Sequence, residues 1–310
     1  MDEGAAAIAL PDATNTGLNV ELGGSLPALT NDDAASLSTA AATYHARRFT
    51  RTVTVSAPGI SFTGCQFDAG VMVGAGADKC LMKNCKFVGG TYGVRCWDGA
   101  AGVVIENCEF DGSSAPGAIA SKGIAGFNFT ARRCNVHHTG SDGIFVVGGN
   151  TVIEYNYIHH VSYGGWNGGA PKWDHADGIQ LINGGDKHTW RYNHIRLPLT
   201  EYNQSPWGGL NACLTMQDTD LTDFVIEGNW LYGGGYTIRL EPNGKTMTGG
   251  KLVDNHIGPK PKHKDVLFGP LNNAGARISA RGNRYDYPGD RTGDGSVAFQ
   301  TPGRQPQPRN

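Results

Sequence analysis

The stretch Val103–Phe110 reads VVIENCEF, and the chain repeats its pattern: an apolar run, two polar residues, Cys or Asn, and a further apolar residue. Related segments include LMKNCKF at 81–87, TVIEYNYI at 151–158 and FVIEGNWL at 224–231. The shared positions are Cys65, Cys85, Cys108, Cys134, Asn156, Asn193, Asn229, Asn255 and Asn283. Their spacing of roughly 20 to 37 residues is typical of a solenoid or repeat array.

Short β-branched runs separated by Gly, Asn and Asp predict strands and turns in each repeat. One coil per roughly 20–28 residues favours an all-β fold, a right-handed parallel β-helix (solenoid) in which each coil pairs with the next. The cysteines would then form a buried column of reduced thiols, continued by a hydrogen-bonded asparagine ladder. A β-propeller is the alternative, but the repeats lack its four strands per blade.

The repeats divide the chain into three parts. We expect an N-terminal cap region over residues 1–50, the parallel β-helix over 51–287 and an irregular C-terminal tail over 288–310. Within the cap, residues 31–48 predict a helix N-capped by Asn31 or Asp32, with an irregular first coil as the alternative. The Pro- and Gly-rich tail cannot pack a core of its own.

Composition excludes several classes of partner. The formal net charge of −2 and the pI near 6.5 argue against nucleic acid. No apolar run approaches the ~20 residues that cross a bilayer, so we expect no membrane insertion. The first residues lack the basic and apolar regions of a signal peptide. We therefore expect a protein that is retained, that leaves by another route, or whose signal has been removed.

A second strand in each coil carries the sequence DGI twice, in SDGIFVV at 141–147 and DGIQL at 177–181. The third positions of these strands are apolar and predict the inward face: Val94, Ile124, Ile144, Ile179, Cys213 and Ile238. The first positions stack as Tyr92, Lys122, Asp142, Asp177, Asn211 and Tyr236. Strict alternation would turn these first positions inward as well, but each sits where the chain leaves a loop, which leaves its direction open.

If the first positions face outward, Asp142 and Asp177 lie about 5 Å apart, because adjacent coils have strand spacing. Two such carboxylates cannot both ionise freely, so one would have a raised pKa and serve as a general acid. Their separation would distinguish a retaining from an inverting glycosidase. The simpler interpretation is that each Asp turns the corner into its strand through bonds to backbone N–H groups, and cation binding is a third.

Other chemistry gathers near the same coils. We expect Asp142 and Asp177 as catalytic residues, with His175 or His160 assisting. Amphipathic rings on the long connections would stack on sugars, and the substrate-binding candidates are Trp166, Trp173, Tyr202, Trp207, Lys122 and Arg239. Lys122 and Arg239 also fit the cations of a lyase, or ion pairs with Asp142 and Glu241. We expect no metal ligands among these residues and no cofactor, with a divalent cation such as calcium as the alternative.

The repeats resemble the right-handed parallel β-helix proteins of the pectate lyase and polygalacturonase superfamily. The combination IHHV…HADGIQL…YNHI…NACL…IEGNWLYGGGYTI, with PDATNTGL near the start, is more similar to β-helix proteins of actinobacteria and to tail proteins of their phages. HADGIQL matches the catalytic motif of polygalacturonases at Asp177-Gly178. Their next-coil Asp pair is replaced by Asn211-Ala212, and Arg239 partly matches their substrate clamp.

The resemblance implies a phage tail protein, minor tail or spike-like, that recognises a polysaccharide of the host cell envelope, with degradation of this glycan left open. Its location would be the virion tail, and its partners that glycan, other virion tail proteins or two further copies in a homotrimer. A free extracellular carbohydrate-active enzyme, either a glycoside hydrolase or a polysaccharide lyase, is the alternative.

Overall fold

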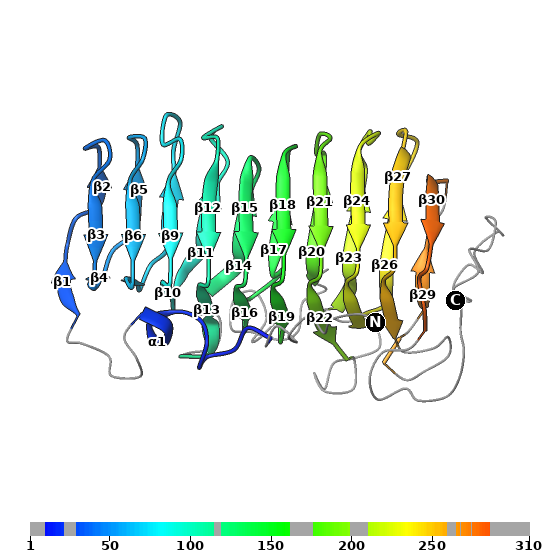
Figure 1. Ribbon diagram of the computed structural model, residues 1–310, viewed down its shortest axis with the longest axis horizontal. Helices are drawn as coiled ribbons and strands as arrows, with labels where there is room; N and C mark the ends of the chain where they lie inside the picture. Colours follow the sequence, from blue (N-terminus) through cyan, green and yellow to red (C-terminus); the bar gives the residue numbers. More distant parts are fainter. Residues whose placement is uncertain are drawn as a thin grey trace, which may run out of the picture.

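The computed structural model describes residues 10–21, 29–114, 119–161, 176–198, 210–258, 265–266, 268–273 and 275–285. Its strands form three parallel ten-stranded sheets, in which each strand pairs with strands three positions away in chain order. The chain therefore winds through all three sheets once per coil, and the coils stack along one axis (Figure 1). The expected all-β parallel β-helix is confirmed.

Sheet A contains β1 (Thr30–Asp32), β4 (Arg47–Phe49), β7 (Gln66–Phe67), β10 (Lys86–Phe87), β13 (Glu109–Asp111), β16 (Asn135–His137), β19 (Tyr157–His159), β22 (His194–Leu197), β25 (Trp230–Gly233) and β28 (His256–Gly258). Sheet B contains β2 (Ser36–Leu37), β5 (Val53–Val55), β8 (Val71–Val73), β11 (Gly90–Cys96), β14 (Ile119–Gly126), β17 (Ile144–Val146), β20 (Ala176–Ile182), β23 (Leu210–Gln217), β26 (Tyr236–Glu241) and β29 (Gly269–Asn272). Sheet C contains β3 (Thr43–His45), β6 (Ser61–Thr63), β9 (Leu81–Lys83), β12 (Val103–Glu106), β15 (Phe129–Arg132), β18 (Thr151–Glu154), β21 (His188–Arg191), β24 (Phe224–Glu227), β27 (Thr248–Val253) and β30 (Arg277–Arg281).

The predicted column of thiols and amides runs through the core between sheets C and A. All seven cysteines are free and buried. The asparagine part is a ladder: Asn156 Nδ2 donates to Asn193 Oδ1 at 2.9 Å, and Asn193 Nδ2 donates to Asn229 Oδ1 at 2.9 Å. The side-chain carbonyl of Asn156 accepts the Cys134 backbone N–H at 2.9 Å, which joins the ladder to the thiols. Residues far apart in the chain are therefore vertical neighbours, as the spacing predicted.

A left-handed residue precedes each rung of this column. Its φ lies between 51° and 67° at Ala46, Gly64, Asn84, Asn107, Arg133, Tyr155, Tyr192, Gly228, Asp254 and Gly282. This conformation turns the chain from a strand of sheet C into the next strand of sheet A within two residues. From Gly64 onward, the residue that follows is the Cys or Asn whose side chain enters the core. The tight corner thus explains why small side chains recur there.

The expected helix over residues 31–48 is wrong. Residues 30–49 instead form β1 to β4, and Thr30 pairs with Arg47 one coil away. Pairing with the next coil overrides the helix propensity of the alanines, so the β-helix begins at Thr30 rather than at residue 51. The expected tail, 288–310, lies outside the described residues.

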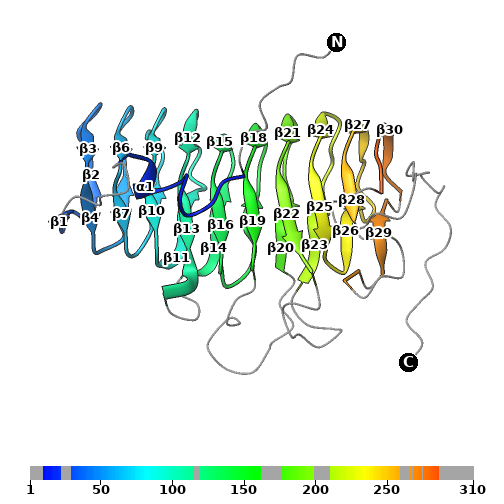
Figure 2. The same cartoon turned by 60° about the horizontal axis from the view of Figure 1, so that its bottom comes forward.

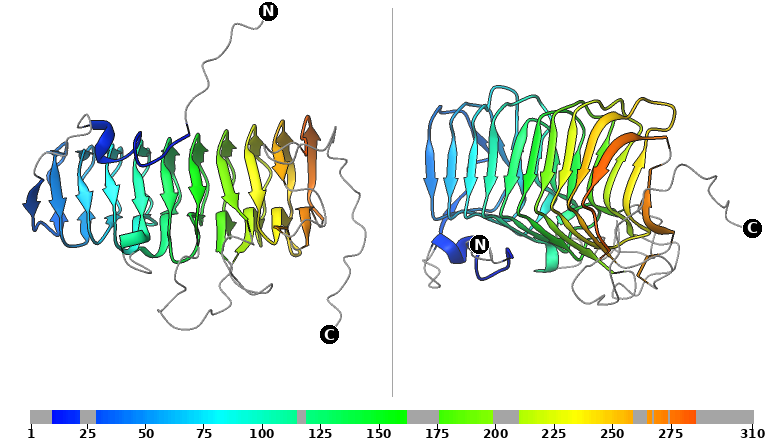
Figure 3. Two further views of the ribbon diagram at one scale, coloured as in Figure 1. Left: turned by 90° about the horizontal axis from the view of Figure 1, so that it is seen from below. Right: turned by 45° about the vertical axis from the view of Figure 1, so that its right-hand side comes forward.

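A short N-terminal segment, residues 10–21, lies along the outside of the stack over sheet A (Figures 2 and 3). It ends in the four-residue helix α1 (Leu18–Glu21). Gly17 donates its N–H to the Asn107 carbonyl at 2.7 Å, and a Cβ at Gly17 would lie 2.9 Å from Glu109 Cβ. Only glycine allows this close packing on β13. No helix in the described part of the chain is long and apolar enough to cross a bilayer.

Candidate functional site

Sheet B places the first DGI position on successive coils. The isoleucines of β14, β17 and β20 pair in register, so the residues two positions earlier follow one another up the stack: Lys122, Asp142 and Asp177. The glycine within each DGI faces the core, because a Cβ at Gly143 or Gly178 would lie 2.5 Å from an isoleucine Cγ2 of sheet A. The chain bends at this glycine, so the aspartate before it lies on the outer side although the isoleucine after it is inward.

The Asp177 side chain is buried within a set of hydrogen-bond donors. Its Oδ1 accepts the Thr215 hydroxyl at 2.6 Å, and the Asn211 amide donates to its two oxygens at 3.0 and 3.2 Å. Burial and the negative charge of Asp142 raise the pKa of Asp177 well above its usual range. A carboxyl group with a raised pKa keeps its proton to higher pH than usual and can serve as a general acid.

Asp142 is also buried, and it makes the bonds of a corner-turning residue. Its Oδ1 accepts the backbone N–H of Asp177 at 2.8 Å, and its Oδ2 lies 3.2 Å from Lys122 Nζ. The backbone bond ties one coil to the next, which is the structural role considered beside catalysis. The ion pair to Lys122 considered in the sequence is also present.

Asn211 does not occupy the rung above Asp177, so this part of the expected register is wrong. Asp177 pairs with Ala212, while Ala176 pairs with Leu210, and Asn211 is the extra residue of a β-bulge. For the same reason Leu214, not Cys213, continues the inward isoleucine row. The bulge turns the Asn211 amide toward the carboxylate of Asp177, as bulges near functional sites commonly re-aim a side chain.

Arg239 extends this polar row along the outer face of sheet B. Its Nη1 donates to Asn211 Oδ1 at 2.9 Å, and its Nη2 pairs with the Glu241 carboxylate. Burial opposes the charge of Arg239, but the hydrogen bond and charge of Glu241 outweigh it and raise the pKa of Arg239. The row Lys122–Asp142–Asp177–Asn211–Arg239 is thus a continuous network across neighbouring coils.

Aromatic and cationic side chains continue the outer face toward the N-terminal coils. The Arg95 guanidinium lies 4.5 Å from the centre of the Trp97 ring, and Tyr92 meets that ring edge-on at 5.3 Å. The Lys122 ammonium lies 4.8 Å from the Phe145 ring, which is 6.4 Å from Trp97. We call Tyr92, Arg95, Trp97, Lys122 and Phe145 the aromatic–cation cluster. All five side chains are partly exposed.

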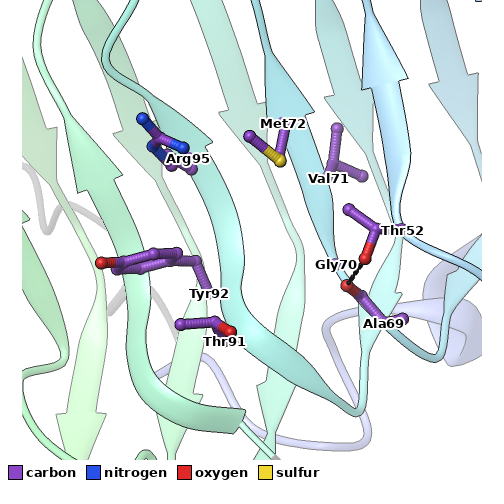
Figure 4. Close-up of a pocket in the computed structure, with 8 residues that line it drawn as sticks. All are labelled: Thr52, Ala69, Gly70, Val71, Met72, Thr91, Tyr92 and Arg95. Carbon is purple, nitrogen blue, oxygen red and sulfur yellow. Dashed lines mark hydrogen bonds between the residues drawn. The ribbon is translucent and has the colours of Figure 1, made fainter. Parts of the chain in front are cut away.

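A hollow of about 180 Å³ opens beside this cluster (Figure 4). Its lining comes from three successive coils: Thr52, Ala69, Gly70, Val71, Met72, Thr91, Tyr92 and Arg95. Arg95 Nε and Trp97 Nε1 are buried and make no hydrogen bond in the described structure. Two such N–H donors are energetically costly unless a ligand or water accepts from them.

None of the described histidines of these coils lies on sheet B: His137, His138, His159 and His160 lie on or directly after strands of sheet A, and His188 begins β21 of sheet C. His160 follows β19, where its ring stacks on His138 at 5.1 Å. His175 lies outside the described residues, as do the four ring-bearing candidates of the long connections: Trp166, Trp173, Tyr202 and Trp207. The expected assistance of His160 or His175 to the Asp pair therefore stays a prediction.

Sequence reasoning overlooked Arg95, Trp97, Phe145 and Thr215. Arg95, Phe145 and Thr215 lie directly after the inward residue of their strands, and that alternation was the available signal. Outward positions differ in residue type from coil to coil, so no recurring sequence pattern identifies them. The ring of Trp97 follows the end of β11 and is located only by its contacts.

We expect Asp177→Asn to remove a pH dependence from stability. The unfolded chain ionises this carboxyl near its ordinary pKa of about 4, whereas folding raises the pKa. The wild type should therefore lose stability as the pH rises from about 4 to the folded pKa, by about 1.4 kcal/mol for each pH unit in that interval. Urea unfolding at about pH 5 and pH 8 measures this. The exposed Asp98→Asn is the control, and parallel pH profiles for wild type and Asp177→Asn would contradict the expectation.

Comparison with known proteins supports the architecture. Residues 51–197, slightly less than half of the chain, match the family described as right handed beta helix region. No curated protein and no solved structure matches the chain. The match starts at β5 and ends at β22, while the three sheets run from Thr30 to Arg281. The chain thus contains a right-handed β-helix region, and its parallel sheets continue on both sides of the matched part.

Proposed function

We propose that this chain binds a polysaccharide along the outer face of sheet B, with the aromatic–cation cluster as the main contact surface. The observation that carries the proposal is the position of Trp97 between Arg95, Tyr92 and Phe145, partly exposed and beside a hollow. Aromatic faces stack on sugar rings, and cations beside them bind hydroxyl or acidic groups. The β-helix is consistent with carbohydrate binding or processing.

The outer face of sheet B suits an extended ligand, because its strands repeat along one axis. Adjacent coils lie about 4.8 Å apart, so a glycan running along the axis meets equivalent positions on successive coils. The polar row from Lys122 to Arg239 continues the surface beyond the aromatic rings. A chain of several sugars would therefore contact both parts.

Cleavage is a second candidate function, and one observation favours it. Burial and the negative charge of Asp142 raise the pKa of Asp177, so its carboxyl keeps a proton at a higher pH than an ordinary aspartate does. The proton would be donated to a glycosidic oxygen, and Asp142 would stay paired with Lys122. Since both carboxylates are buried, a glycan would reach them only after the surrounding groups part. Recognition therefore has the stronger support.

The biological setting that we propose is the tail of a virion, acting on a host cell-envelope polysaccharide. Its support is the sequence resemblance to tail proteins of actinobacterial phages. In that setting the protein would contact other tail proteins or assemble as a homotrimer. A free extracellular enzyme with the same surface is the alternative.

Binding to purified cell-envelope polysaccharides of actinobacteria, measured by co-sedimentation and calorimetry, tests the proposal. We expect Trp97→Ala to weaken binding at least tenfold, because stacking and cation–π contacts are lost together. Tyr192→Ala removes an exposed ring from the corner that follows β21 and should leave the affinity unchanged. Melting temperatures report whether both variants fold.

The same samples test cleavage through new reducing ends or unsaturated products. Product from the wild type that disappears in Asp177→Asn, with binding retained, supports the second function. Binding without product leaves recognition alone. If no glycan binds, or if Tyr192→Ala weakens binding as much as Trp97→Ala, the proposed surface is wrong.

A further inference from the structure

A cluster of potential metal ligands lies on sheet A, apart from the residues discussed above. Asp111 pairs in register with His137, and His137 with His159, on three successive coils. One ligand atom each from Asp111, His137 and His138 lies within 4.8 Å of the other two. His137 is largely buried, while Asp111 and His138 are partly exposed, so an ion from solvent can reach the cluster.

The backbone turns two consecutive histidines to the same side. Neighbouring residues of a strand normally point to opposite faces, but His138 has a left-handed φ of 56° that ends β16. As a result, His137 Nδ1 and His138 Nδ1 lie 2.6 Å apart. Asp111 Oδ1 lies 3.7 Å from His137 Nδ1. Three ligand atoms thus converge from two coils.

A second layer of contacts orients these ligands. Glu109 is 3 % exposed, and its Oε1 lies 3.5 Å from His137 Nε2. A carboxylate at this ring nitrogen favours the tautomer with hydrogen on Nε2, which leaves the Nδ1 lone pair available, as in many metal-binding histidines. The Ser113 N–H and hydroxyl both donate to Asp111 Oδ1 and fix the carboxylate. Gly17 of the N-terminal segment packs directly on Glu109.

The charges leave the cluster with one excess negative charge. Lys86 Nζ lies 3.0 Å from Asp111 Oδ2 and 3.4 Å from Glu109 Oε2, so one cation faces two carboxylates.

We propose that Asp111 Oδ1, His137 Nδ1 and His138 Nδ1 bind a divalent transition-metal ion, with zinc as the best match. Imidazole and carboxylate ligands suit zinc, which holds them at about 2.0–2.2 Å. A tetrahedral ion spaces its ligands by roughly 3.4 Å, so the two Nδ1 atoms separate by about 1 Å on binding. His138 then carries its hydrogen on Nε2. Solvent supplies the fourth ligand.

The next coil contains a matched comparison. His159 Nδ1 and His160 Nδ1 also lie 2.6 Å apart, and φ at His160 is 50°. The residues paired with His159 are His137 on one side and Arg196 on the other, so no carboxylate lies in register with this pair. The same histidine geometry without Asp111 should bind the metal weakly.

Titration calorimetry of the full chain with zinc sulfate tests the assignment, with cobalt absorption as a second readout of tetrahedral coordination. We expect one zinc site, weakened at least 30-fold by Asp111→Asn and by His138→Asn. Asparagine is chosen at position 138 because it tolerates the left-handed conformation. The control His160→Asn should change the affinity less than threefold.

Melting temperatures without metal establish that each variant folds. Excess zinc should raise the melting temperature of the wild type and of His160→Asn, but not that of Asp111→Asn or His138→Asn. Absence of zinc binding by the folded wild type overturns the proposal. So does a loss in His160→Asn equal to that in His138→Asn. Neither result bears on glycan binding, which uses sheet B.

Discussion

Asn193→Ala should destabilise the protein by about 3–5 kcal/mol, since it interrupts the amide ladder between Asn156 and Asn229. The side-chain carbonyl of Asn193 accepts from both the backbone N–H and the amide of Asn156, and its own amide donates to Ile153 O and Asn229 Oδ1. Alanine leaves these buried groups without partners and opens a cavity. Urea unfolding followed by circular dichroism measures the loss.

The matched control is Asn31→Ala, which truncates an exposed asparagine of β1. We expect a change of less than about 0.5 kcal/mol there, as for most surface substitutions. A loss below about 1 kcal/mol in Asn193→Ala would mean that the ladder adds little to stability. The stack would then depend mainly on the backbone pairing and the apolar core.

Gly178→Ala should destabilise the protein by about 2–4 kcal/mol, through overpacking rather than lost contacts. The new Cβ would lie 2.5 Å from Ile195 Cγ2 and 2.6 Å from the Cys213 carbonyl oxygen. The isoleucine can move only within a packed core, and the carbonyl belongs to the next strand of sheet B. Thermal and urea unfolding of the purified variant measure the effect.

Gly185→Ala provides the comparison. Its Cβ would approach no atom closer than 3.4 Å, and its φ is not in the left-handed region. Alanine there restricts the unfolded chain and should be neutral or slightly stabilising. Equal losses in the two variants would show that the clash does not explain the glycine of the DGI motif.

The core of the fold was predictable because equivalent positions of successive coils have the same packing environment and therefore the same residue types. Each rung between sheets C and A needs a small side chain after a left-handed corner, so cysteine and asparagine recur in the same sequence context, as at Cys134 and Asn156. The spacing alone therefore predicted which distant residues touch. The expectation of a helix over 31–48 was wrong because a local run of alanines carries no information about the pairing of β1 with β4 on the next coil.

The candidate site was only partly predictable. Asp142 and Asp177 stack on neighbouring coils as the DGI repeat indicated, but the bulge at Asn211 shifted the following strand by one residue. A bulge of one residue occurs in this strand only once, so it produces no repeated sequence pattern from which it could be predicted. Trp97 and Arg95 were missed because outward side chains are not constrained by the core. Their importance follows from contacts across coils, which no local pattern encodes.

The amide ladder also gives the stack a direction. Each asparagine donates to the amide of the following coil, from Asn156 through to Asn283. Trimming the last coil would remove Asn283 Oδ1, which accepts from the Asn255 backbone N–H and from the Asn255 amide, and the amide would keep its bonds to Ile226 O and Val253 O. Trimming the first would cost this column only the sulfur contact of Cys65 to Tyr44 O, at 3.5 Å. The two ends of this column are therefore unequal: shortening from the N-terminal side removes fewer of its hydrogen bonds than shortening from the C-terminal side.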